Sequence, residues 1–481
     1  MSLVLLVDET VVDASPEAVF DLFGQRSDAG WLFGAECETL DVGSVLRFRL
    51  PLRAGGGIGT ELEATGRVMC AERARRIVIA HETPWRGRLT CVLAPSDEGT
   101  RVRLVAEVDD EGFDWLMRRQ GFDVEEEVDP RTEPVGLLVS QSGSASVFSA
   151  ASENAARLAV EEVNSEGGLR GRPLRLVVAD DATDPASGAI AMTRLVERDG
   201  CRVVFANVTS ATFRAVQPVA ERAGVLLIYP LVNEGGRTGD GVFRLGERPA
   251  DQLRSSIPWL MRMTGGRRWF LAGNDYCWPK ATNRCARRVI GASRGVVVGE
   301  RYERLGSRRF DAVLEAIERS GAELVVSTFV GADEVAFEQR CHEAGIRERC
   351  QTLALALDEN TREHVGSAAG DGLWTVFGYF QQLATRANRD FLHRYHTRFG
   401  LHAPPVSSLS ESVYEAVHLY AAAARAARSR DPLDAGRTLS GRSFDGPRGR
   451  VVIRNPGDVS QQMFLAQAAP GGFRIVEALG P

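Results

Sequence analysis

The sequence predicts an α/β protein of two lobes, preceded by a small α+β domain. Near residue 130 the apolar pattern changes from the alternation of strands to a longer period. After this point, buried strands and amphipathic helices follow one another repeatedly, which indicates parallel sheets. A chain of 481 residues has room for two or three domains of ordinary size.

The composition is that of an ordinary globular protein, with 44% hydrophobic and 25% charged residues. The net charge of −6 and the lack of a basic run with interleaved aromatics argue against direct binding of nucleic acid. The eight cysteines form neither a CxxC pair nor a metal-type pattern with histidine. We therefore expect free thiols in a reducing compartment, and neither a metal nor a cofactor.

The start of the chain predicts a strand rather than a targeting segment. Residues 1–7 are apolar, but they run directly into Asp8, Glu9 and Thr10, whereas a secretory signal needs a longer apolar core. No run of 18 apolar residues occurs, so we expect no membrane span and no membrane partner. From these features we expect a cytoplasmic protein.

The first 125 residues predict a strand, a helix, an antiparallel series of strands and a short closing helix. Ser15 and Pro16 are suited to begin the first helix, as its cap and its first residue. We place this α+β domain at residues 1–125 and an acidic linker that contains proline at 126–133. The strands are predicted at 4–12, 44–50, 60–70, 76–83, 89–94 and 100–108, and the closing helix at 113–119.

This order resembles the START-like superfamily (SRPBCC, polyketide cyclase type), which has a helix-grip fold. The resemblance is carried by residues 12–20, by Trp31 and by residues 99–102. It implies an apolar ligand held between the sheet and the last helix, although the helix predicted here is short for a deep pocket. Residues 1–125 contain no convergent acid/base set, so we expect no enzyme in this domain.

The stretch 272–279 is the most informative part of the second domain. It follows a short apolar run that predicts a buried strand, and open α/β sheets bind ligands at the carboxyl ends of their strands. Tyr276 and Trp278 are two residues apart and can point the same way into such a crevice. The alternative is that both rings pack at a strand–helix corner.

Residues 134–481 resemble the type I periplasmic-binding-protein fold, in the branch of amide and urea receptors. The resemblance implies two Rossmann-like lobes, with lobe 1 at about 134–250 and 376–434 and lobe 2 at about 251–375 and 435–481. The cytoplasmic amide sensors of this branch regulate amidase genes by sequestering an RNA-binding antiterminator. The matching stretches are 136–143, 159–164, 166–168, 171–173, 229–230, 234–235, 273–279 and 444–449.

The resemblance also implies a ligand site in the cleft between the lobes. The Ser210 hydroxyl can donate and accept a hydrogen bond at once, which suits a neutral amide. Leu231 stands where amide sensors have a polar residue, which implies a bulkier or more apolar ligand. The candidate ligand-binding residues are Ser142, Ser210, Tyr229, Pro230, Leu231, Tyr276, Trp278, Phe329 and Tyr379.

We therefore expect a receptor rather than an enzyme. It would bind a small neutral amide- or urea-like ligand, close its lobes and signal to an antiterminator or another regulatory protein of amide metabolism. The chain has no phosphate-binding loop, dinucleotide fingerprint or GxSxG elbow. A homo-oligomer is compatible with the sequence. The alternative is a transport-type solute-binding protein for amides, urea or branched-chain amino acids.

Overall fold

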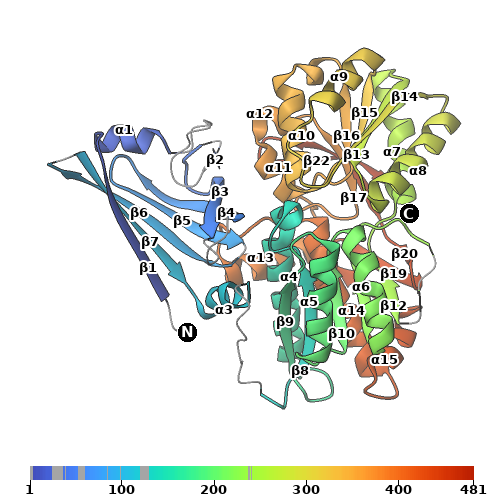
Figure 1. Ribbon diagram of the computed structural model, residues 1–481. Coiled ribbons are helices and arrows are strands. Elements are labelled where there is room, and N and C mark those ends of the chain that lie inside the picture. Colours follow the sequence, from blue (N-terminus) through green and yellow to red (C-terminus); the bar gives the residue numbers. More distant parts are fainter. Residues whose placement is uncertain are drawn as a thin grey trace. The chain divides into compact units, whose positions relative to one another are not determined.

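The computed structural model describes residues 4–23, 36–37, 39–52, 60–83, 85–97, 99–119, 129–236, 239 and 241–480. The chain divides into two compact units, Met1–Val128 and Asp129–Pro481 (Figure 1). The division falls inside the segment predicted as a linker. Trp31, one of the residues that carry the START-like resemblance, lies outside the described residues.

The first unit is a seven-stranded antiparallel sheet with two described helices. The strand order is β1-β7-β6-β5-β4-β3-β2, so the first strand pairs with the last one. This α+β order of elements is the predicted one, whereas membership of the START-like superfamily stays a prediction. The elements are β1 (Val4–Val12), α1 (Pro16–Asp21), β2 (Glu36–Cys37), β3 (Val45–Leu52), β4 (Thr60–Glu72), β5 (Arg76–Thr83), β6 (Gly87–Ser96), β7 (Gly99–Val108) and α3 (Asp110–Arg119).

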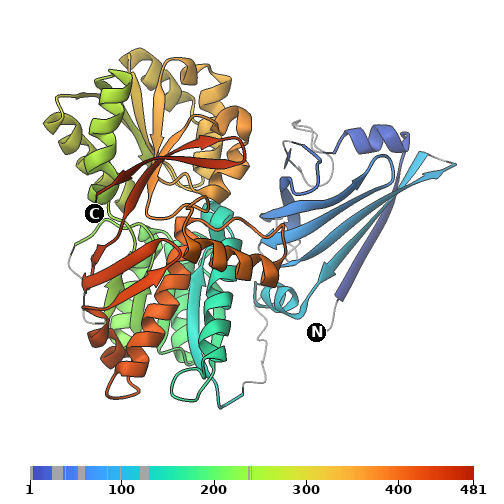
Figure 2. The same ribbon diagram turned by 180° about the vertical axis from the view of Figure 1, so that it is seen from behind.

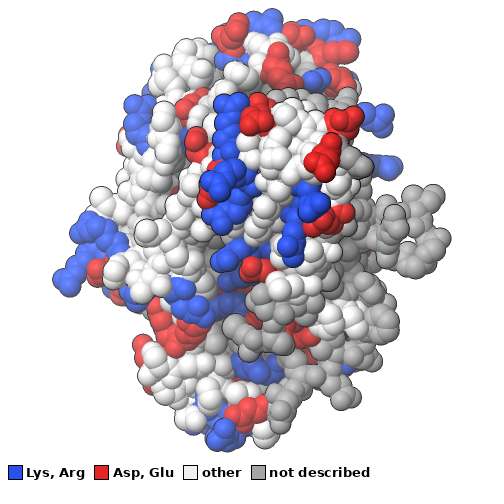
Figure 3. All heavy atoms as spheres, turned by 90° about the vertical axis from the view of Figure 1, so that its left-hand side faces the viewer, with Lys and Arg blue, Asp and Glu red and all other residues white. Residues whose placement is uncertain are grey.

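The core of this unit lies between α1 and the sheet. The Ser15 hydroxyl caps α1 by accepting from the Ala18 N–H at 3.2 Å, and the helix buries Val19 against the sheet. Strand β5 alternates buried and partly exposed residues, with Ile77 and Ile79 facing the core. In the face shown in Figure 3, basic side chains stand beside acidic ones. Arg73–Asp21 and Arg76–Glu72 are exposed ion pairs of this unit, and such pairs contribute little stability.

Lobe 1 of the second unit has a five-stranded parallel sheet in the order β12-β11-β10-β8-β9. Helices α4 and α14 pack together on one face, and α5 and α6 pack together on the other (Figures 1 and 2). Its elements are β8 (Glu133–Val139), η1 (Ser144–Phe148), α4 (Ser149–Ser165), β9 (Leu174–Asp180), α5 (Pro185–Glu197), β10 (Val203–Asn207), α6 (Ser210–Ala223), β11 (Leu226–Tyr229), β12 (Val242–Arg244), α13 (Arg386–Phe399), α14 (Ser408–Ala426), α15 (Pro432–Leu439), β18 (Ser443–Gly446), β19 (Gly449–Asn455) and β20 (Asp458–Ser460).

Lobe 2 has a seven-stranded sheet in the order β14-β13-β15-β16-β17-β21-β22. The first five strands of this order are parallel, and β21 and β22 are antiparallel to their neighbours. Its elements are α7 (Pro249–Thr264), β13 (Arg268–Asn274), α8 (Cys277–Ala292), β14 (Val296–Glu303), α9 (Asp311–Ser320), β15 (Leu324–Thr328), α10 (Ala332–Glu343), η2 (Ile346–Glu348), β16 (Gln351–Ala354), α11 (Glu359–Val365), α12 (Ser367–Gly370), β17 (Trp374–Phe377), β21 (Met463–Ala469) and β22 (Gly472–Leu479).

The structure corrects the predicted assignment of residues 435–460 to lobe 2. Leu439 and Ile453 are fully buried in the core cluster of lobe 1, together with residues of α14. Strands β18 to β20 form a small sheet of their own, and β18 contacts α14. Only β21 and β22 join the sheet of lobe 2. The chain therefore crosses between the lobes three times, near residues 247, 378 and 461.

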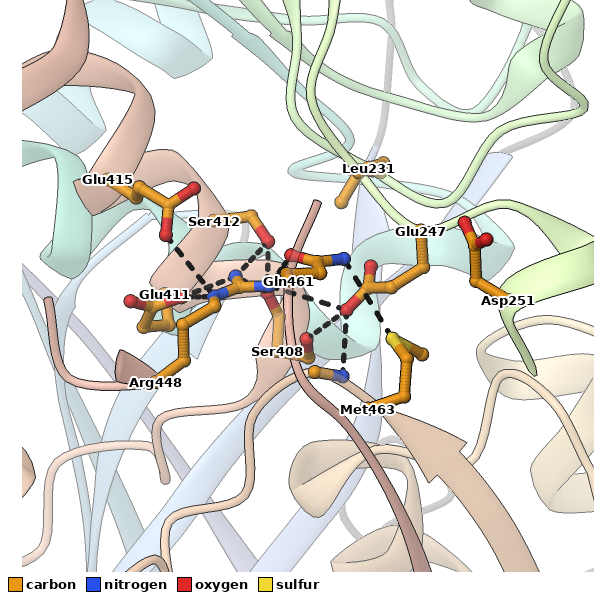
Figure 4. Close-up of polar contacts among 12 residues, drawn as sticks. Leu231, Glu247, Asp251, Ser408, Glu411, Ser412, Glu415, Arg448, Gln461 and Met463 are labelled. Carbon is orange, nitrogen blue, oxygen red and sulfur yellow. Dashed lines mark hydrogen bonds and ion pairs between the residues drawn. The ribbon is translucent and has the colours of Figure 1, made fainter. Parts of the chain in front are cut away.

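A buried arginine connects the three crossovers (Figure 4). Arg448 is 4% exposed, and its Nη1 donates to Gln461 Oε1 at the third crossover at 2.9 Å. The same nitrogen lies 3.4 Å from Glu247 Oε1 at the first crossover. Glu247 Oε1 accepts from the Gly378 N–H at the second crossover at 3.1 Å and from the Ser408 hydroxyl at 2.6 Å. We call these residues, with Glu411 and Glu415, the hinge cluster.

The hinge cluster holds more carboxyl groups than positive charges. Arg448 contacts Glu247, Glu411 and Glu415, and all three glutamates are at most 2% exposed. Burial raises the pKa of Glu411, and it raises the pKa of Glu415 to about 8. One guanidinium cannot neutralise three carboxylates at this depth, so part of the cluster is protonated near neutral pH.

Replacement of Arg448 by methionine tests the hinge cluster. The Arg448→Met variant keeps most of the side-chain volume but leaves buried carboxylates without a cation, so we expect a loss of about 3–5 kcal/mol in the free energy of unfolding. Urea denaturation followed by tryptophan fluorescence measures it. Arg450→Met, at an exposed position of β19, is the matched control and should change stability by less than about 0.5 kcal/mol. Equal effects of the two substitutions would contradict the structural role of Arg448.

A second prediction concerns the pH dependence of stability. The pKa of Glu415 rises on folding from 4.5 to about 8, so its contribution is complete below the lower value and is lost as the pH rises through the higher one. Glu415→Gln removes this titration and keeps the shape. Between about pH 5 and pH 8, the melting temperature of the wild type should fall relative to that of the variant. Calorimetry measures both proteins, and a constant difference across this range would show that Glu415 does not titrate there.

Candidate functional site

The candidate site lies where the carboxyl ends of the strands of the two lobes meet. On one side, Ser144 of η1 touches Gly331, which precedes α10: a Cβ added to Gly331 would lie 2.1 Å from the Ser144 carbonyl oxygen. On another side, α6 of lobe 1 packs against α8 of lobe 2. The two lobes are therefore in direct contact around this region, as in a closed receptor.

Lobe 1 contributes a pair of hydroxyl groups at the start of a helix. Thr209 caps α6, so Ser210 occupies its first turn. The Ser210 hydroxyl lies 3.1 Å from the Tyr229 hydroxyl, which also donates to the Val208 carbonyl at 3.1 Å. Phe213 stacks on the Tyr229 ring with 4.1 Å between centroids. Burial raises the pKa of Tyr229, so this hydroxyl stays neutral. A helix start with fixed hydroxyls favours an oxygen-rich, partly negative ligand group.

Lobe 2 contributes two aromatic residues at the start of α8. Tyr276 is the N-cap residue of this helix and is half-buried. Burial raises the pKa of Tyr276, and Tyr229 and Glu234 of lobe 1 add to the rise. Tyr276 packs against the apolar cluster that contains Tyr229. Trp278 is 1% exposed, and its indole N–H has no hydrogen-bond partner among the described residues. A buried N–H of this kind is unfavourable unless a ligand accepts from it.

Asp333 is a candidate site residue that was not predicted from the sequence. Its Oδ2 accepts from Asn274 Nδ2 at 2.6 Å and from the Gly306 N–H at 2.8 Å. Burial raises the pKa of Asp333 to about 6, and hydrogen bonds from Asn274, Gly306 and Ser144 of lobe 1 oppose the rise. The signal was present, because Asp333 follows strand β15 as Tyr276 follows β13. This carboxyl group adds an acidic site to a region that was predicted to suit a neutral ligand.

The structure brings most of the predicted ligand residues together. Tyr229, Leu231 and Trp278 belong to one apolar cluster that includes both lobes, and Tyr276 packs against it. Pro230 is buried between Tyr229 and Leu231, and Ser210 joins through the Tyr229 hydroxyl. Ser142 is also buried, two residues before the Ser144 contact, but its hydroxyl donates to Asp180 Oδ2 at 2.6 Å.

Phe329 and Tyr379 are corrections, because the structure gives both a packing role. Phe329 is fully buried in an aromatic cluster with Phe310 and Phe337, on the side of lobe 2 covered by α9 and α10. Tyr379 is fully buried in the core of lobe 1, where its hydroxyl donates to Asn388 Oδ1 at 2.8 Å. A position at the end of a strand does not determine which face the side chain takes.

Within the described ranges, no group of three or more His, Cys, Asp or Glu side chains is arranged to hold a metal ion. All eight cysteines are free thiols. In the same ranges, no helix combines the length and the apolar character needed to cross a bilayer.

A family model described as periplasmic binding protein matches residues 133–472, which is more than half of the 481 residues. The chain belongs to this periplasmic binding protein family. The match includes both lobes of the binding protein and the hinge cluster. It also includes the lobe junction, by which we mean the region around Ser144, Ser210, Tyr229, Tyr276 and Gly331. The first unit lies outside the match.

Curated relatives of this binding protein carry the names of amino acid receptors. It is 24% identical to Leu/Ile/Val-binding protein homolog 3 of Brucella melitensis over 218 residues, which cover 44% of this chain and 58% of the relative. It is 33% identical to the Leu/Ile/Val-binding protein BraC3 of Rhizobium johnstonii over 108 residues, which cover 22% of this chain and 29% of the relative. The matches thus span a little over half, or less, of the relatives' own lengths.

Solved structures of solute-binding proteins share the fold. The branched-chain amino acid transporter substrate-binding protein LivJ of Streptococcus pneumoniae, in complex with isoleucine, superimposes with a TM-score of 0.64 at 19% identity, covering 73% of this chain and 100% of that one. A solute-binding protein of R. palustris in complex with benzoate gives a TM-score of 0.64 at 21% identity, covering 73% and 98%. At this identity the likeness shows the fold alone.

The contact between Ser144 and Gly331 yields a prediction about closure. Gly331 has φ 59° and ψ −126°, and the Gly331→Ala variant would place a methyl group against the Ser144 carbonyl. We expect the lobes of this variant to stay further apart, so small-angle scattering should give a larger radius of gyration than for the wild type.

The matched control for this variant is Gly321→Ala. Gly321 also has a positive φ, of 62°, but it ends α9, and the nearest atom to an added Cβ is 3.4 Å away. This substitution strains the backbone without touching the other lobe, so the radius should not change. If all three proteins have the same radius, the closed contact does not exist in solution.

Proposed function

We propose that residues 129–481 form a receptor that captures a small apolar α-amino acid between its lobes. The observation that carries the proposal is the pairing of two unlike polar groups across the lobe junction. The Ser210 and Tyr229 hydroxyls stand at the start of α6 in lobe 1, and Asp333 lies at the edge of lobe 2. A zwitterion needs two opposed groups of this kind.

Each part of such a ligand has a matching group. The carboxylate suits the N-terminus of α6 and the Ser210 hydroxyl, because both favour negative charge. The ammonium group suits the Asp333 carboxylate. The apolar side chain suits Leu231 and Trp278, which belong to the apolar cluster that includes both lobes. The names of the curated relatives, which are Leu/Ile/Val-binding proteins, support a branched-chain amino acid.

The second candidate ligand is a neutral amide, and two observations favour it. Asp333 already accepts hydrogen bonds from Asn274 and Gly306, and its raised pKa favours the protonated form in mildly acidic solution. The unpaired indole N–H of Trp278 could donate to an amide carbonyl. This second proposal also includes signalling to an antiterminator or another regulatory protein, a cytoplasmic location and a homo-oligomer.

Isothermal titration with two ligands of the same carbon skeleton separates the candidates. Leucine carries both charges, whereas 4-methylpentanamide keeps the carbon chain but has neither the ammonium nor the carboxylate. We expect leucine to bind at least about tenfold more tightly. Tighter binding of the amide would favour the second candidate, and the failure of both ligands to bind would refute both.

A substitution locates the binding site. Ser210→Ala removes one hydroxyl at the start of α6 and should weaken leucine binding by about tenfold, which corresponds to one lost hydrogen bond to a charged group. The control is Ser165→Ala, because Ser165 is exposed at the last residue of α4, in the same lobe but at the opposite end of its sheet from the start of α6. If both variants bind leucine as the wild type does, the ligand is not held at α6.

A further inference from the structure

Lobe 2 contains a second hollow that lies away from the lobe junction. It has a volume of about 1000 Å³, in the range of small-molecule sites. It is lined by residues at the amino ends of parallel strands, namely Gly266 before β13, Glu323 before β15, Gln351 of β16 and Trp374 of β17. The lobe junction lies at the carboxyl ends of the same sheet, so a strand of five residues, about 17 Å, separates the two regions.

Five residues form the apolar part of the walls of this hollow, namely Trp259, Met263, Trp374, Ile475 and Val476. Trp259 of α7 and Trp374 have ring centroids 5.2 Å apart at an angle of 55°. The Trp374 indole N–H donates to Gln351 Oε1 at 3.2 Å, which fixes its ring. Met263 is 47% exposed, and Ile475 of β22 is half-buried. Large apolar groups left open in a concave surface are typical of ligand sites.

The charged residues of the hollow favour an anion with a single charge. Arg474 donates to the neutral Gln467 Oε1 at 2.6 Å, and in the part of the chain that the structure describes it has no carboxylate partner. Arg349 is paired with Glu318 at 2.7 Å. The Glu323 carboxylate accepts hydrogen bonds from the backbone N–H groups of Arg267 and Arg268. One guanidinium is therefore left to bind a carboxylate, next to a negative charge that disfavours a dianion.

The hollow is joined to the hinge by three elements. Helix α7 begins just after Glu247 and ends at the hollow with Met263. Strand β17 begins in the hollow and ends next to Gly378, and β21 begins after Gln461 and contributes Gln467 to the lining. Each of the three crossovers is thus connected directly to an element that also lines this hollow.

We propose that this hollow is an effector site for a flat apolar monoanion such as an aromatic carboxylate, and that its occupation shifts the balance of open and closed lobes. The ring would lie against Trp259 and Trp374, and the carboxylate would bind Arg474. A ligand that draws these walls together displaces the ends of α7, β17 and β21, and so acts on the hinge cluster at their other ends. The site is independent of the identity of the ligand at the lobe junction.

The test uses 2-naphthoate with the full-length protein, because this probe is flat and carries one negative charge. Calorimetric titration should show saturable binding, and 2-naphthamide, which lacks the charge, should bind at least about tenfold more weakly. Arg474→Gln should weaken naphthoate binding at least about tenfold, and the half-buried Trp259 allows Trp259→Ala as a second variant with the same expected loss.

Two controls assign the binding to the hollow. Arg301→Gln removes an exposed arginine from β14, at the opposite edge of the sheet from β22, and should leave the affinity unchanged. Ser210→Ala, at the lobe junction, should also leave it unchanged. If Ser210→Ala abolishes naphthoate binding and Arg474→Gln does not, the probe binds between the lobes and the proposal is wrong. The absence of any binding in the wild type would also overturn it.

Hydrogen exchange tests the link to the hinge. The Gly378 N–H donates to Glu247 in the hinge cluster, so its exchange reports the opening of this contact. Saturating 2-naphthoate should change the exchange rate of the peptide that contains Gly378 at least about threefold in the wild type, but not in Arg474→Gln. Unchanged exchange in the wild type at full occupancy would overturn the effector role.

Discussion

The arrangement of the two lobes depends on one buried guanidinium. Arg448 can remain charged at this depth only because Glu247, Glu411 and Glu415 surround it. Without Arg448, the burial of these carboxyl groups would cost still more free energy. The cluster receives partners from all three crossovers, so each of them is held relative to the others. A rotation of the lobes must move these partners together. The hinge is therefore a defined polar assembly rather than a set of flexible links.

The candidate ligand site follows from this hinge. With the crossovers fixed, the carboxyl ends of the two sheets face each other, and Tyr229 of lobe 1 and Tyr276 of lobe 2 meet at one apolar cluster. The contact between Ser144 and Gly331 sets how closely the lobes approach. A ligand that contacts both lobes binds the closed form better than the open form, and this difference in affinity is what drives closure.

The two ends of the lobe 2 sheet have different environments. The carboxyl ends meet lobe 1, whereas the amino ends surround the hollow between Trp259 and Trp374. Short parallel strands and α7 join these ends. Because such elements are stiff, a displacement at one end is transmitted to the other, and both proposed ligand sites would act on the same hinge cluster.

The sequence by itself determined the two-lobed fold and the position of Ser210, Tyr229 and Tyr276 at the ends of strands, because strand, helix and cap patterns are local. Asp333 could have been found by the same reasoning. Only the tertiary structure decided that Phe329 and Tyr379 turn into cores, and that residues 435–460 join lobe 1. It also decided the partners of Arg448, since Glu247 is 201 residues away in the sequence. Contacts at such separations depend on how whole elements pack, and no local pattern encodes them.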